Sequence, residues 1–183
     1  MKKSLTNPAL KSLEILIGRW EIELTNASFL QNKSDKLNGS ATFDLIEKEG
    51  FLVMRQGDAP LPWTRWVISR DELEQNYLVA YYDDRGVSRQ YEMSFNNGIW
   101  KIWREAPGFW QRFEGKISKD GNTITAHWEK STDNGKNWEY DFDLNYKRAA
   151  SVIEGLHCIA NMHSIKPCIV INLPLRHSRF FIA

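Results

Sequence analysis

The sequence contains only two cysteines, Cys158 and Cys168, and both lie near its end. Two cysteines so placed indicate no disulfide framework. The basic residues at the start, Lys2 and Lys3, are not followed by the apolar stretch of a signal peptide. No apolar run is long enough to span a bilayer. We therefore expect a cytoplasmic protein without a membrane partner.

An excess of charge of one sign is also missing. The 24 Lys and Arg nearly balance the 23 Asp and Glu, for a net charge of +1. This balance does not favour a nucleic-acid partner, since such partners are bound by basic surfaces. We find no G-x-S-x-G motif and no glycine-rich phosphate loop, and we identify no catalytic residue. Four potential metal ligands lie near the end, but their spacing is not that of a zinc site, so we expect no metal: His157, Cys158, His163 and Cys168.

Aromatic residues and short alternating segments are abundant instead. All eight Trp lie before residue 139, and aromatic residues favour strands. Helical spacing is clear only in residues 8–17, where Asn7 is the expected N-cap. After Gly18, apolar and polar residues alternate with period two, and Asn-Gly and Asp-Gly turns separate many of the segments. Ten strands are predicted: residues 20–25, 41–45, 51–55, 63–69, 77–82, 87–95, 99–105, 109–117, 123–130 and 138–146.

Ten successive strands with no helix between them predict an all-β fold, because such strands must close on themselves or stack as two sheets. We expect an up-and-down antiparallel β-barrel of about ten strands, with a short N-terminal helix. The barrel domain is predicted over residues 1–148. Residues 149–183 differ sharply in composition, with three of the four His and no Trp, and form an atypical C-terminal extension.

Several stretches carry a resemblance to a known family. They are Gly18-Arg19-Trp20, residues 81–94, residues 103–113 and residues 128–138. Across about residues 10–148 the chain resembles an uncharacterised bacterial lipocalin-like (calycin) family. The resemblance implies the barrel fold but no particular function. It also implies a structural role for Trp20, which would pack across the closed end under a basic residue of the last strand, here Arg148.

Polar residues on apolar strand faces are the candidate binding residues. Arg89 shares a face with Tyr91, and Gln111 shares one with Phe113. A charge on an apolar face costs several kcal/mol unless it is paired or wet. The alternatives are a ligand pocket, a position at the rim, or a pair between Arg89 and an inward carboxylate such as Glu105. In a pocket, Arg89 would hold an anionic group. The candidate ligand-binding residues are Arg65, Arg89, Tyr91, Trp103, Gln111 and Phe113.

The leading hypothesis is non-catalytic binding of a small, mostly apolar molecule with an anionic or polar end inside the barrel, without a cofactor. One alternative is an enzyme acting on a bound hydrophobic ligand, although no general base is seen to face inward. A second is a haem protein similar to the nitrobindin-type barrels, with His127 as the one barrel histidine. The third is an interaction module with a filled barrel that docks a partner or forms a homodimer.

Overall fold

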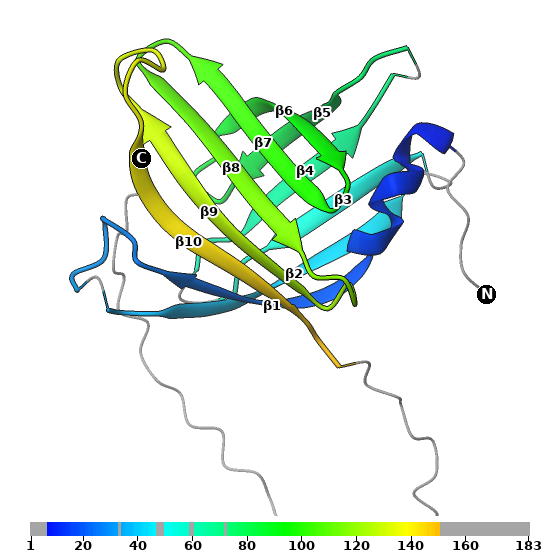
Figure 1. The fold of residues 1–183 in the computed structure, drawn as a ribbon, viewed down its shortest axis with the longest axis horizontal. Coiled ribbons are helices and arrows are strands. Elements are labelled where there is room, and N and C mark those ends of the chain that lie inside the picture. The colour runs from blue at the N-terminus through cyan, green and yellow to red at the C-terminus, as the bar shows by residue number, and fades with distance from the viewer. Residues whose placement is uncertain (1–6, 33, 47–49, 59–60, 72, 151–183) are drawn as a thin grey trace, which may run out of the picture. The chain divides into compact units, whose positions relative to one another are not determined.

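The chain folds into a closed antiparallel barrel of ten strands, shown in Figure 1. The computed structural model describes residues 7–32, 34–46, 50–58, 61–71 and 73–150. Each strand pairs with its neighbours in sequence, and β1 pairs with β10 to close the ring. The strands are β1 Gly18–Thr25, β2 Leu37–Ile46, β3 Phe51–Gln56, β4 Thr64–Ser69, β5 Tyr77–Asp83, β6 Ser88–Asn96, β7 Ile99–Ala106, β8 Phe109–Ile117, β9 Thr123–Ser131 and β10 Glu139–Arg148.

This architecture confirms the all-β up-and-down barrel that the alternation predicts. Tight turns keep successive strands antiparallel. Asn97 and Gly98 connect β6 to β7 with φ angles of 52° and 75°, which are the positive values of a hairpin turn whose twist matches the strands. The four potential metal ligands of the C-terminal extension lie outside the described residues. Within the described ranges, no helix has the length and apolar character needed to span a bilayer.

The predicted helix is present as a 3₁₀ helix, η1, over Pro8–Leu16. The Asn7 side chain accepts a hydrogen bond of 2.9 Å from the Ala9 backbone N–H, as an N-cap does. Three leucines at helical spacing are buried against the barrel, which holds η1 in place: Leu10, Leu13 and Leu16.

Trp20 and Arg148 join η1 to the barrel. The Trp20 indole is fully buried and donates a hydrogen bond of 2.8 Å to the Leu16 carbonyl. The Arg148 guanidinium lies 4.1 Å from the Trp20 ring centroid. It also donates to the carbonyl oxygens of Ile15 at 2.6 Å and Gly121 at 3.1 Å. Residues of the first and last strands thus close the side of the barrel at which β1 begins and β10 finishes.

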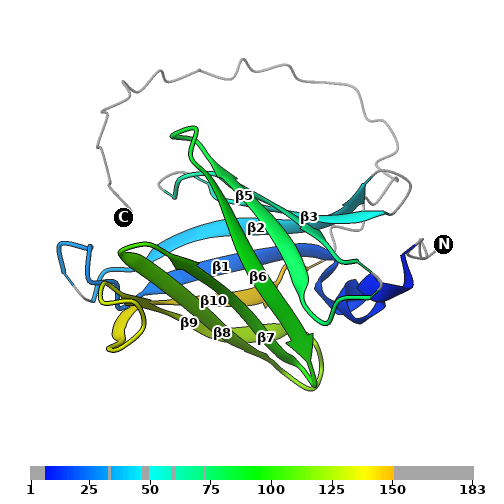
Figure 2. The same ribbon diagram turned by 90° about the horizontal axis from the view of Figure 1, so that it is seen from above.

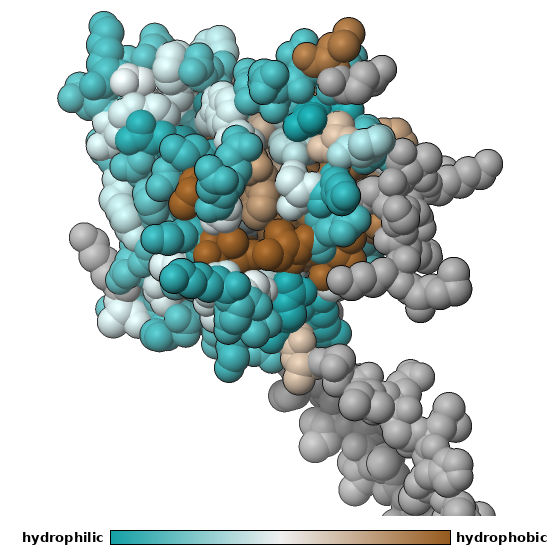
Figure 3. Space-filling model, turned by 45° about the vertical axis from the view of Figure 1, so that its right-hand side comes forward, coloured by the Kyte–Doolittle hydropathy of each residue, from teal (hydrophilic) through white to brown (hydrophobic). Residues whose placement is uncertain are grey.

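The opposite end is here called the distal end. It carries the connections from β5 to β6, from β7 to β8 and from β9 to β10, as the alternating strand directions require and as Figure 2 allows the reader to follow. Along each strand, inward residues alternate with outward ones. Hydrophilic residues cover most of the face seen in Figure 3, and hydrophobic residues gather there in a narrow strip. One face of each strand is therefore buried inside the barrel, away from solvent.

Candidate functional site

A first layer of aromatic rings crosses the barrel on the η1 side. Trp100 of β7 lies 5.8 Å from Phe43 of β2, between ring centroids. These two strands are five places apart in the ring of ten, so the two side chains come from opposite walls. Trp100 also contacts Phe113 at 4.8 Å and Tyr146 at 5.8 Å. The four rings are at most 3% exposed, and they fill the interior at this level.

A second layer lies nearer the distal end. Trp66 of β4 and Trp128 of β9 also come from strands five places apart, and their ring centroids are 6.3 Å apart. Tyr81 and Tyr91 contact Trp66 at 4.7 Å and 5.3 Å. A ligand cannot occupy this level without displacing rings. Trp66, Tyr81 and Trp128 keep 6–8% of their surface exposed, more than the rings of the first layer.

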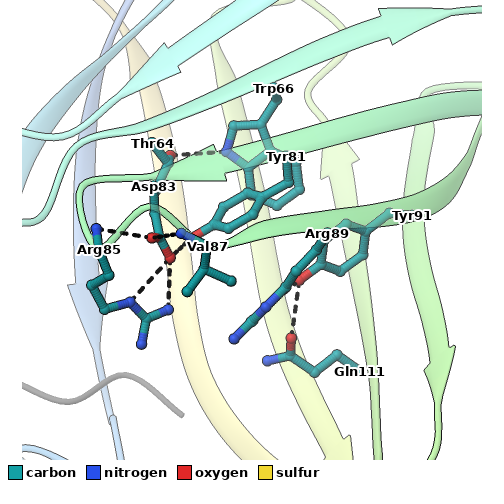
Figure 4. Close-up of polar contacts among 9 residues, drawn as sticks. All are labelled: Thr64, Trp66, Tyr81, Asp83, Arg85, Val87, Arg89, Tyr91 and Gln111. Carbon is teal, nitrogen blue, oxygen red and sulfur yellow. Dashed lines mark hydrogen bonds and ion pairs between the residues drawn. The ribbon is translucent and has the colours of Figure 1, made fainter.

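Arg89, Tyr91 and Gln111 meet beside this layer, and Figure 4 shows their side chains together. Arg89 is near the start of β6 and Gln111 near the start of β8, so both lie toward the distal end. Tyr91 donates a hydrogen bond of 3.2 Å to Gln111 Oε1, and it accepts one of 3.5 Å from Arg89 Nη1. The Arg89 guanidinium also lies 5.7 Å from the Tyr81 ring centroid. Among the described residues no carboxylate forms an ion pair with Arg89. Glu105, the alternative partner named above, is exposed on the outer face of β7.

Asp83 forms a separate, internally neutralised cluster beside Arg89 (Figure 4). It accepts hydrogen bonds from the Tyr81 hydroxyl at 3.0 Å, from Arg85 Nη2 at 2.6 Å and from the Val87 backbone N–H at 3.2 Å. Burial acts to raise the pKa of Asp83, but these hydrogen bonds, with that of Arg85 first, hold it below its ordinary value. Burial, and then the bond to Asp83, raise the pKa of Tyr81 well above its ordinary value. Asp83 is therefore charged and Tyr81 neutral at pH 7.

Two cationic residues that sequence reasoning missed also face the distal interior. Arg104 lies directly across from Gln111 in the ladder between β7 and β8, on the inner face of β7 with Ile102. Lys130 lies directly across from Gln111 on the other side, and its Nζ is 3.1 Å from Asp141 Oδ1. Every second residue of a strand lies on the same face, so Arg104 shares a face with Ile102 and Lys130 shares one with Trp128. This alternation could have placed both cationic residues inside.

The structure places Arg65 and Trp103 on the outer face, which corrects their expected position in the interior. Arg65 is exposed between the buried Thr64 and Trp66, and it lies 5.6 Å from the Trp63 ring. Trp103 pairs across the strands with the exposed Arg112. Both strands carry large apolar residues on both faces, so alternation alone does not say which face is buried. The ring that enters the interior from β4 is that of Trp66.

His127 also lies on the outer face. Its ring stacks on Tyr140 with centroids 6.0 Å apart and planes inclined by 6°. It therefore does not face the aromatic layers, where a haem bound inside the barrel would need its ligand. In the part of the chain that the structure describes, no three His, Cys, Asp or Glu side chains gather into a cluster that could hold a metal ion.

Comparison with protein-family models and with curated proteins gives no match to this chain. The solved structures similar to it include the crystal structure of Rv2717c from M. tuberculosis, with a TM-score of 0.57 and 12% sequence identity. The match covers 80% of this chain and 99% of that chain. At this identity the similarity shows a shared fold and carries no information about the site.

Proposed function

We propose that the distal end of the barrel binds a small molecule with an aromatic or apolar body and an anionic end, without catalysis. The observation that carries the proposal is the environment of the Arg89 guanidinium. This half-buried group faces inward, and the contacts described for it are neutral: the Tyr91 hydroxyl and the Tyr81 ring. A partly desolvated charge without a counter-charge is costly, and an anionic ligand would offset that cost.

The neighbouring groups suit the rest of such a ligand. A guanidinium can contact a carboxylate or phosphate through two parallel hydrogen bonds. Gln111, held by Tyr91, can orient the polar end through its amide. Trp66, Tyr81 and Trp128, which each keep 6–8% of their surface exposed, offer apolar contact to the body of the ligand.

Catalysis is less well supported than binding. Asp83 is the buried carboxylate beside Arg89, but it is already held by Arg85 and by Tyr81. A general base needs a pKa near the working pH, whereas the pKa of Asp83 is lowered and that of Tyr81 is raised. At pH 7 neither group is poised to take up a proton.

Native mass spectrometry of the protein purified from its own host tests the proposal. We expect the wild type to carry a small molecule and Arg89→Ala to lose it, because the anionic end loses its counter-charge. Arg65→Ala is the matched control, since it removes an arginine from the outer face of a nearby strand and should retain the molecule. Circular dichroism should show both variants folded.

Retention of the small molecule by Arg89→Ala would contradict the proposed anchor. A wild-type protein without any bound molecule, which also fails to bind the aromatic anions described below, would contradict ligand binding itself. That result would favour the second candidate, an interaction module, which the rings that meet across both layers support.

A further inference from the structure

Four cationic residues lie near the distal end of the barrel, and the protein supplies a counter-charge to two of them. Arg85 Nη2 lies 2.6 Å from the carboxylate of Asp83, and Lys130 Nζ lies 3.1 Å from that of Asp141. Asp83 and Asp141 are only 4% and 5% exposed, so these carboxylates are committed to their partners. Two of the four cationic residues thus have a buried counter-charge.

Arg89 and Arg104 differ in this respect. Among the described residues neither forms an ion pair with a carboxylate. They lie on the inner faces of the adjacent strands β6 and β7. Arg89 contacts Tyr91, Tyr91 donates to Gln111, and Gln111 lies directly across from Arg104. Arg89 therefore contacts Tyr91 of the Tyr91–Gln111 pair, Arg104 is the cross-strand neighbour of Gln111, and no described carboxylate forms an ion pair with either arginine.

We infer that the ligand carries two negative charges at one end, as a phosphate monoester or an aromatic dicarboxylate does; this deepens the function proposed above and rests on it. A monoanion would neutralise one guanidinium and leave the other unpaired. A dianion would offer one negative charge to each of the two. Charge-assisted hydrogen bonds from both arginines would then hold one ligand group.

The test compares two probes with the same ring system, 1-naphthyl phosphate and 1-naphthoate, by titration at pH 7.5 followed by tryptophan fluorescence. In the wild type we expect the phosphate to bind about tenfold more tightly, because it gains a second charge-assisted contact. Arg104→Ala should abolish this preference and leave naphthoate binding nearly unchanged. Arg89→Ala should weaken both probes, and Arg65→Ala should weaken neither.

Two further measurements distinguish a ligand whose two charges come from a phosphate from one whose charges come from two carboxylates. The second pKa of a phosphate monoester is about 6, so the affinity for 1-naphthyl phosphate should fall between pH 7.5 and pH 5 while that for naphthoate stays constant. Naphthalene-2,3-dicarboxylate tells a dicarboxylate site from a phosphate site. Whichever of the two dianions binds more tightly, preference for it over naphthoate supports the inference.

Equal affinity of the wild type for naphthoate and for both dianions would overturn the two-charge inference and leave the proposed function standing. Full preference for the dianions in Arg104→Ala would overturn it in the same way. Failure of all three probes to bind would overturn the inference as well. If the protein from its own host also carries no small molecule, the proposed function fails with it.

Discussion

Replacing Trp20 by alanine lowers the free energy of unfolding by about 3–5 kcal/mol, the range for truncating a fully buried tryptophan. The side chain is 0% exposed, so its removal leaves a cavity between η1 and the barrel. The Leu16 carbonyl loses the hydrogen bond from the indole, and Arg148 loses the ring over which it lies. Several contacts that close one end of the barrel depend on this single residue.

Urea denaturation at pH 7 measures this loss, and Trp63→Ala is its control. Trp63 is 48% exposed, so its truncation should change stability by less than about 1 kcal/mol. Similar losses in the two variants would show that the closed end does not depend on Trp20. Trp20→Phe helps to apportion the effect, because phenylalanine keeps an aromatic ring under Arg148 but cannot donate to Leu16.

Asp83→Asn is expected to lower stability by about 2 kcal/mol at pH 7, since charge-assisted hydrogen bonds from Arg85 and Tyr81 are lost or weakened. The figure stays modest because the Arg85 side chain is 37% exposed and solvent screens its charge. The pKa of Asp83 is lower in the folded state than in the unfolded chain. Its contribution is therefore complete above the unfolded pKa of about 4 and is lost as the pH falls through the lower, folded value.

The stability gap between the wild type and Asp83→Asn should accordingly be constant from pH 7 to pH 5 and should shrink below about pH 4. Denaturant titrations at a series of pH values measure it. Asp84→Asn is the matched control, because Asp84 is the exposed neighbour in the same turn and should show little gap at any pH. A gap for Asp83→Asn that is independent of pH down to about pH 2 would contradict the role assigned to its charge.

The strands were predictable because each has one buried face. Along β10, buried residues such as Leu144 and Tyr146 alternate with Asp143 and Asn145, and a period of two fixes both the element and its inner side. Turn chemistry supplied the boundaries, as Asn97 and Gly98 show with their positive φ angles. Both properties are local, so the sequence contains them without reference to the rest of the fold.

The site was harder to predict, because choosing the inner face requires knowledge of the neighbouring strands. On β4 and just before it, both Trp63 and Trp66 are large and aromatic, and the register with β3 and β5 places Trp66 inside. On β7 the same question arises for Trp103 and Arg104, and the charged residue is the inward one. Arginine inside a barrel contradicts the simplest hydrophobic pattern, and such exceptions mark candidate binding sites.

A crystal structure of the protein with 1-naphthyl phosphate tests the central claim most directly, namely that the distal end holds an anion between β6 and β7. The account predicts a phosphate group within hydrogen-bond distance of both Arg89 and Arg104, with the naphthyl ring against Trp66 or Trp128. A phosphate bound elsewhere, or an Arg89 guanidinium that keeps the same neutral contacts in the complex, would contradict it.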